Sequence, residues 1–122
     1  YVLGYELPGE NRVNNAVLGL PADSKILAQM LEFTSNRTSI APFLSRKQQA
    51  EMRALADAGT PMHITQQPWG VWGPMMVTHY VHALGLCDHV LGLDAFYPVT
   101  FRERINASWG LSMTACHPKT AF

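Results

Sequence analysis

Helical and strand-like segments alternate along this 122-residue chain, and their order constrains the fold more than any other feature of the sequence. Apolar residues at helical spacing predict three longer helices, near residues 22–34, 45–58 and 74–84. Short runs rich in β-branched and aromatic residues predict strands near residues 1–6 and 89–93. Strands that alternate with helices are typical of an α/β arrangement, so we expect the α/β fold class.

The middle helix carries the strongest boundary signals. Ser45 is a suitable N-cap because its hydroxyl can accept a hydrogen bond from a backbone N–H of the first turn. Gly59 is a suitable stop, since glycine readily adopts the left-handed conformation that ends many helices. The first helix is expected to begin near Pro21 and Asp23. The third begins at Pro74, whose missing N–H costs nothing in a first turn.

The composition excludes several classes of protein. The formal net charge is zero, so there is no electrostatic case for a nucleic-acid partner. No apolar run reaches the roughly 18 residues of a membrane span. Charged residues make up only 15% of the chain, which suggests that part of its surface meets other protein or a membrane. Cys87 and Cys116 are too few for a disulfide framework, and we expect two small buried thiols.

The stretch WGVWGP, residues 69–74, combines large rings, glycines and a helix-starting proline. Gly73 would let the backbone approach another molecule closely, and the rings of Trp69 and Trp72 are suitable platforms for the flat face of a sugar or base. The free N–H groups of a helix start also favour polar ligands. A Trp-rich packing corner explains the same residues, and from these residues alone both interpretations stay open.

Four short segments occur in a particular order over roughly residues 1–98: GYE, then NNAVLGLP before a helix, then GP opening a helix, then FYP closing a strand. This order resembles the DXD-containing glycosyltransferases of the mannosyltransferase-like family 32. That family includes capsular polysaccharide enzymes, outer-chain mannosyltransferases of yeast and sphingolipid mannosyltransferases. The resemblance implies a GT-A fold, an α/β nucleotide-sugar-binding domain, and sugar transfer with retention of anomeric configuration.

The resemblance also implies a domain organisation and a set of partners. Residues 1–122 would form a single domain, the C-terminal half of a transferase domain. The low fraction of charged residues adds the hypothesis that one face is apolar because the N-terminal half normally covers it. The partners would be a nucleotide-sugar donor and a glycan or glycolipid acceptor. Such an enzyme would be membrane-associated, in the Golgi of a eukaryote or on the cytoplasmic face of a bacterial membrane. The compartment itself is left open by the sequence.

A divalent metal, Mn²⁺ or Mg²⁺, is expected for the full-length family member, held by the DXD motif against the donor's diphosphate. This sequence contains no Asp-X-Asp, and its aspartates are isolated. Of the His-aromatic motif expected after FYP, only His117 is present, without the Trp that should follow. We therefore expect this chain alone to be inactive and to bind nucleotide-diphosphate sugars weakly, without dependence on manganese.

The resemblance assigns catalytic roles to Glu6 and Asn15. Glu6 ends the first strand and would supply a carboxylate for sugar hydroxyls, although a solvated turn residue explains it equally simply. Asn15 resembles an asparagine placed against the transferred sugar, where an amide can both donate and accept hydrogen bonds. A turn-forming asparagine is its alternative. Asn14 is a substrate-binding candidate by the same argument.

The remaining substrate-binding candidates are Trp72, Gly73 and Pro74, of which the last two match the GP motif. His79 and His82 have the spacing of metal ligands on a helix, but no third ligand is evident and we expect a surface or hydrogen-bonded pair. No Ser-His-Asp or Cys-His arrangement is supported by order and spacing. A second function remains open, a noncatalytic α/β module that binds a glycan or a protein partner. A DXD motif upstream in the full gene product would decide for the transferase.

Overall fold

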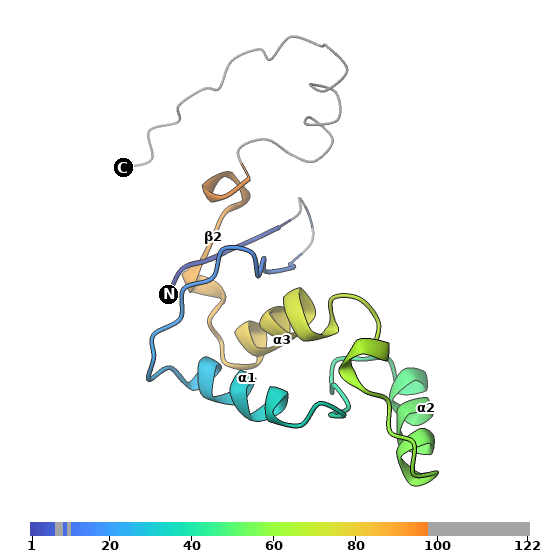
Figure 1. Ribbon diagram of the computed structural model, residues 1–122. Coiled ribbons are helices and arrows are strands. Elements are labelled where there is room, and N and C mark those ends of the chain that lie inside the picture. Colours follow the sequence, from blue (N-terminus) through green and yellow to red (C-terminus); the bar gives the residue numbers. More distant parts are fainter. Residues whose placement is uncertain (7–8, 10, 98–122) are drawn as a thin grey trace.

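The computed structural model describes residues 1–6, 9 and 11–97, and Figure 1 shows the course of the chain. This part of the chain is a small mixed helix–strand structure. Each of its three α-helices overlaps one of the helix ranges expected from the sequence, and each of its two strands lies within one of the expected strand ranges. The helices and strands are α1 (Lys25–Ser35), α2 (Arg46–Asp57), α3 (Met76–Ala83), β1 (Leu3–Gly4) and β2 (Val90–Leu91). Four short helical turns accompany them: η1 (Ile64–Gln66), η2 (Val71–Met75), η3 (Cys87–His89) and η4 (Leu93–Ala95).

The two strands lie far apart in sequence but pair in parallel, with Leu3 opposite Val90 and Gly4 opposite Leu91. The other edge of β1 is covered by residues 13–19 through isolated antiparallel bridges. Figure 1 shows this strand layer beside α1 and α3, with α2 set away from it. The layer is smaller than the predicted strand ranges, because each strand contains two residues.

One buried cluster joins the strand layer to two helices. Its members are fully or almost fully buried and come from β1, the segment after it, α1 and α3: Leu3, Val13, Ile26, Val77 and Val81. Burial of one such aliphatic side chain stabilises a fold by roughly 1.5–3 kcal/mol. This cluster therefore fixes α3 against the strand layer.

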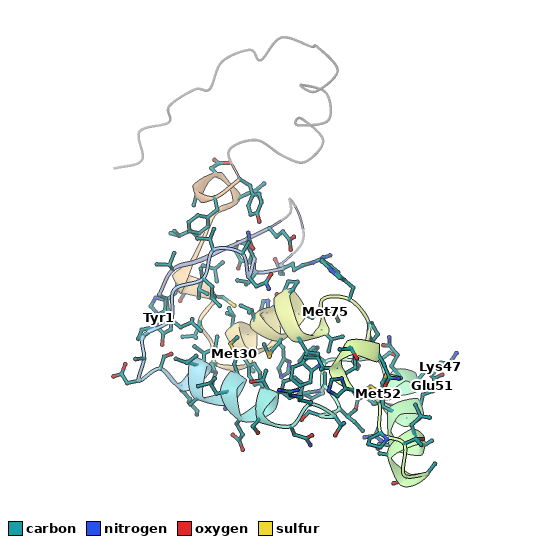
Figure 2. All side chains as sticks on the ribbon, viewed as in Figure 1. Tyr1, Met30, Lys47, Glu51, Met52 and Met75 are labelled. Atoms are coloured by element: carbon teal, nitrogen blue, oxygen red, sulfur yellow. The ribbon has the colours of Figure 1, made fainter. Side chains whose placement is uncertain are left out.

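A second buried cluster contains Ala41, Leu44, Met52 and Val71. Met52 comes from α2, and Figure 2 shows it on the side of that helix that faces the rest of the molecule. Lys47 and Glu51 lie on the outer side of α2, where they form an exposed ion pair at 4.0 Å. Because η2 contributes to this cluster and α3 to the first, the WGVWGP stretch joins the two.

The boundaries of α2 follow the sequence signals. The Ser45 hydroxyl accepts a hydrogen bond from Gln48 N–H, and the Gln48 side chain accepts one from Ser45 N–H, which together form a capping box. At the other end, Gly59 has φ +81° and the N–H of Thr60 donates to Leu55 O at 3.0 Å. This is a Schellman motif, so both predicted ends are confirmed.

The starts of the other two helices differ from the prediction. The N-cap of α1 is Ser24, whose Oγ accepts from Leu27 N–H at 3.4 Å, and Pro21 lies further upstream. The α-helical part of α3 begins at Met76, because the π-helical turn η2 includes Pro74 and directly precedes it. Trp72 and Gly73, which directly precede the proline within η2, have non-helical backbone angles, so η2 is not a regular first turn of α3.

Candidate functional site

Residues that the sequence assigned to a sugar site line one hollow of about 300 Å³: Asn15, Trp72, Gly73 and Pro74. The rest of its lining comes from residues upstream of η2 and from its N-cap: Ile64, Gln67, Pro68, Trp69 and Gly70. The structure therefore brings the NN segment and the GP segment, which are far apart in sequence, to the same surface depression.

Asn15 and Gly73 are in direct contact at this hollow. A Cβ at position 73 would lie 2.8 Å from Asn15 Nδ2, so a larger residue there would require the Asn15 amide to move. The φ of Gly73 is −136°, whereas Gly70 has the left-handed φ of +85°. The glycine at 73 thus serves a close approach, and the glycine at 70 serves the turn that starts η2.

Trp72 forms one wall of the hollow and is also anchored from behind. Its indole Nε1–H donates to Gln67 Oε1 at 2.8 Å, and Gln67 Nε2 donates in turn to Ser39 O at 3.1 Å. The ring centroid of Trp72 lies 4.9 Å from that of Phe33. Since Gln67 is only 9% exposed, this chain of contacts is part of the packed interior. The Trp72 side chain therefore packs against Phe33 and Gln67 and also lines the hollow, so the two interpretations of this residue are compatible.

Trp69 has a different environment from Trp72, although each tryptophan directly precedes a glycine in the same stretch. Its side chain is 80% exposed, and it lines both the 300 Å³ hollow and a second, larger groove. An exposed ring at the border of two depressions contributes little to packing. It is available as a stacking surface for a ligand.

Asn14 lies outside the hollow. It is 3% exposed, its Nδ2 donates to the Tyr97 hydroxyl, and its Oδ1 accepts from Ala16 N–H. Its backbone N–H donates to Gly4 O at 2.9 Å. The side chain thus joins the segment beside β1 to the end of the described chain, and a role in sugar binding stays a prediction.

Glu6 also lies outside the hollow. Its backbone N–H donates to Arg12 O at 2.9 Å, and its side chain is half-buried. The Oε2 atom is buried and has no hydrogen-bond partner among residues 1–6, 9 and 11–97. A buried carboxylate oxygen is costly to leave unpaired, so this atom marks Glu6 for mutagenesis.

The larger groove, of about 930 Å³, was not predicted. It runs along the outer face of α3 and is lined mainly by apolar atoms: Asn11, Arg12, Phe43, Trp69, Met75, Thr78, His79, His82 and Ala83. Figure 2 labels Met75, which lies at the start of this face. The sequence signal for it was the spacing of residues 75, 78, 79, 82 and 83, which places them on one side of a helix.

The two histidines of α3 have separate environments. The His79 ring lies 5.0 Å from the Phe43 ring and 5.1 Å from the Tyr80 ring, and burial lowers the pKa of the His79 imidazole. Burial also raises the pKa of the Tyr80 phenol, and the negative charge of Glu32 raises it further. His82 instead forms hydrogen bonds through both ring nitrogens. The pair does not act as one unit.

Within the described part of the chain, no group of three or more His, Cys, Asp or Glu side chains is arranged to hold a metal ion. The divalent cation that the resemblance implies for the full-length family stays a prediction. His117, the remaining candidate ligand, lies outside the described residues.

No family model, no curated protein and no solved structure matches this chain. The GT-A fold and the glycosyltransferase family therefore stay predictions from the sequence motifs. Among the residues that the structure describes, no helix is both long and apolar enough to cross a membrane.

Proposed function

We propose that this chain provides the sugar-binding surface of a retaining glycosyltransferase that uses a nucleotide-sugar donor. The observation that carries the proposal is the convergence of Asn15, Trp72 and Gly73 on one hollow. Asn15 and Gly73 were selected from two sequence motifs that lie far apart along the chain, and Trp72 directly precedes the second motif.

The chemistry of the hollow suits a carbohydrate. An amide such as that of Asn15 can donate to one hydroxyl and accept from its neighbour. The exposed indole of Trp69 offers an apolar face for the C–H groups of a sugar ring. Gly73 has no Cβ that would displace the Asn15 amide from its position at the hollow.

The size of the hollow narrows the ligand. Small-molecule sites measure roughly 300–1,000 Å³, and this hollow of about 300 Å³ is at the lower end. It suits one sugar ring better than a complete nucleotide sugar. The proposal is therefore that this surface contacts the sugar, while the nucleotide is bound elsewhere. Glu6 is retained as a second catalytic candidate at a distance from the hollow, because its buried Oε2 has no described partner.

Titration of the chain with monosaccharides and nucleotide-diphosphate sugars tests the proposal. Calorimetry and ligand-observed NMR should show weak binding that is unchanged by manganese. Asn15→Ala should weaken the affinity about 3–10-fold, the value of one lost neutral hydrogen bond. Asn36→Ala is the matched control, because Asn36 is exposed and lines neither depression. Equal affinities for the Asn15→Ala protein and its parent would exclude the hollow as the sugar site.

The second candidate function is a noncatalytic glycan- or partner-binding module. The large groove of about 930 Å³ beside the hollow favours it, since a binding module needs surface rather than catalytic groups. The two functions differ in the full gene product. A transferase should move a labelled sugar from a nucleotide donor to an acceptor, and a binding module should retain both molecules unchanged.

A further inference from the structure

A cysteine and a histidine lie in hydrogen-bond contact at the end of α3. Cys87 Sγ is 3.3 Å from His82 Nδ1, and the other ring nitrogen, His82 Nε2, is 3.2 Å from the backbone oxygen of Asn11. The contact between the two side chains is exposed to solvent. Cys87 itself is partly buried against the first core cluster.

The carbonyl of Asn11 determines how the imidazole is protonated. A carbonyl oxygen can only accept a hydrogen bond, so His82 Nε2 must carry a hydrogen in order to donate to it. In the neutral ring, Nδ1 then has a free lone pair, and this atom faces the Cys87 thiol. The thiol of Cys87, the imidazole of His82 and the carbonyl of Asn11 therefore form a series of nucleophile, base and group that orients the base.

A glycine turn explains why these residues meet. Gly85 has φ +66°, its N–H donates to His82 O at 3.1 Å, and the N–H of Leu86 donates to Val81 O at 2.9 Å. This Schellman motif reverses the chain at the end of α3 and carries Cys87 back over the last helical turn. The pair is thus fixed by backbone hydrogen bonds, even though its side chains are accessible.

We propose that Cys87 is a modification site that reacts with low-molecular-weight disulfides, with His82 as its general base. His82 and Asn11 also line the groove of about 930 Å³, so the group attached to Cys87 would be placed at the edge of that groove. This proposal does not rest on sugar binding and would hold for a protein with either candidate function.

The reaction is a thiol–disulfide exchange. His82 Nδ1 takes the proton of the Cys87 S–H bond, whose electron pair stays on sulfur. The sulfur attacks one sulfur of the small disulfide, a new S–S bond forms, and the S–S bond of the reagent breaks. The departing thiolate then takes the proton from the imidazolium. Cys87 is oxidised to a mixed disulfide, and half of the reagent is reduced to a free thiol.

The test uses the full chain in a Cys116→Ser background, so that Cys87 is the remaining thiol. The probe is oxidised glutathione at neutral pH, and intact-mass spectrometry follows the gain of one glutathionyl group with time. His82→Gln keeps a donor for Asn11 O but removes the base. Because the pair is exposed, we expect the rate to fall by about tenfold, less than the roughly hundredfold or more of an enclosed general base.

His89→Gln is the matched control, since His89 lies on the same short turn as Cys87 but its ring contacts Tyr1. It should react at the rate of the parent. In denaturant, the His82→Gln and parent chains should react equally, because the fold no longer holds the pair together. A His82→Gln chain that reacts as fast as its parent under native conditions overturns the proposal. So does a tenfold difference that persists in denaturant.

Discussion

Trp72→Phe should destabilise the protein much more than Trp69→Phe, although the chemical change is the same and the positions are three residues apart. Phenylalanine at 72 can keep the stack on Phe33 but has no N–H for Gln67 Oε1, which accepts at 2.8 Å in the native structure. Gln67 is 9% exposed, so its oxygen would be left buried without that donor. An unsatisfied buried acceptor costs about 1–3 kcal/mol. Trp69 is 80% exposed, and its replacement should stay within about 0.5 kcal/mol.

Urea denaturation followed by circular dichroism measures both free energies of unfolding. A double-mutant cycle then isolates the hydrogen bond, with Gln67→Met as the second change because methionine keeps the length and removes the amide. The coupling energy between positions 67 and 72 should be about 1 kcal/mol or more. For a domain of this size, each kcal/mol corresponds to a shift of roughly 4–8 °C in Tm.

Equal losses for the two tryptophan variants would refute the reasoning. Additive free energies in the Gln67 and Trp72 cycle would refute it as well, because the hydrogen bond would then contribute nothing to the corner. Loss of sugar binding in Trp72→Phe at unchanged stability would show that the ring acts on a ligand alone.

Other perturbations follow from the same structure. Gly85→Ala and Gly59→Ala should each lower the free energy of unfolding in urea by about 1–2 kcal/mol, because both glycines have positive φ. A Cβ at either position meets nothing within 4 Å, so the loss would come from backbone strain and not from a clash. The free energy of unfolding should fall as the pH drops below about 6.5, because burial lowers the pKa of His79 in the folded state and the unfolded chain then binds more protons. His79→Gln should flatten this part of a stability–pH curve, and an unchanged slope would contradict the assignment. Gly4→Ala should lower Tm, since its Cβ would clash with the ring of Phe96 and overpacking typically costs about 1–3 kcal/mol.

The helices could be predicted because their signals are local. Ser45 and Gly59 act on backbone groups within a few residues, so α2 could be bounded from the sequence alone. The start of α1 was predicted near Pro21 and Asp23, because both residue types are common at helix beginnings. Ser24 is the residue whose side chain reaches the Leu27 N–H.

The contacts of the candidate site were harder to predict, since each depends on residues brought together by the whole fold. The sequence motifs placed Asn15 and Gly73 in one site by resemblance. They did not predict that the Asn15 amide lies directly against Gly73, as it does in the structure. The Cys87–His82 pair was missed, because a histidine and a cysteine five residues apart meet only when the helix between them ends in a reversed turn. The sequence HALGLC contains that signal, since its glycine stands where a Schellman motif needs it.

Parallel pairing of residues 3–4 with residues 90–91 sets the order in which the chain can fold as it leaves the ribosome. β1 emerges before α1, α2 and α3, and its partner strand is translated after all three of these helices. The capped helix α2 depends on hydrogen bonds within residues 45–60 and can form once that segment has emerged. Leu3 and Gly4 gain their partners in the parallel sheet only when Val90 and Leu91 arrive. Until then, the nascent chain presents them to chaperones and to neighbouring chains.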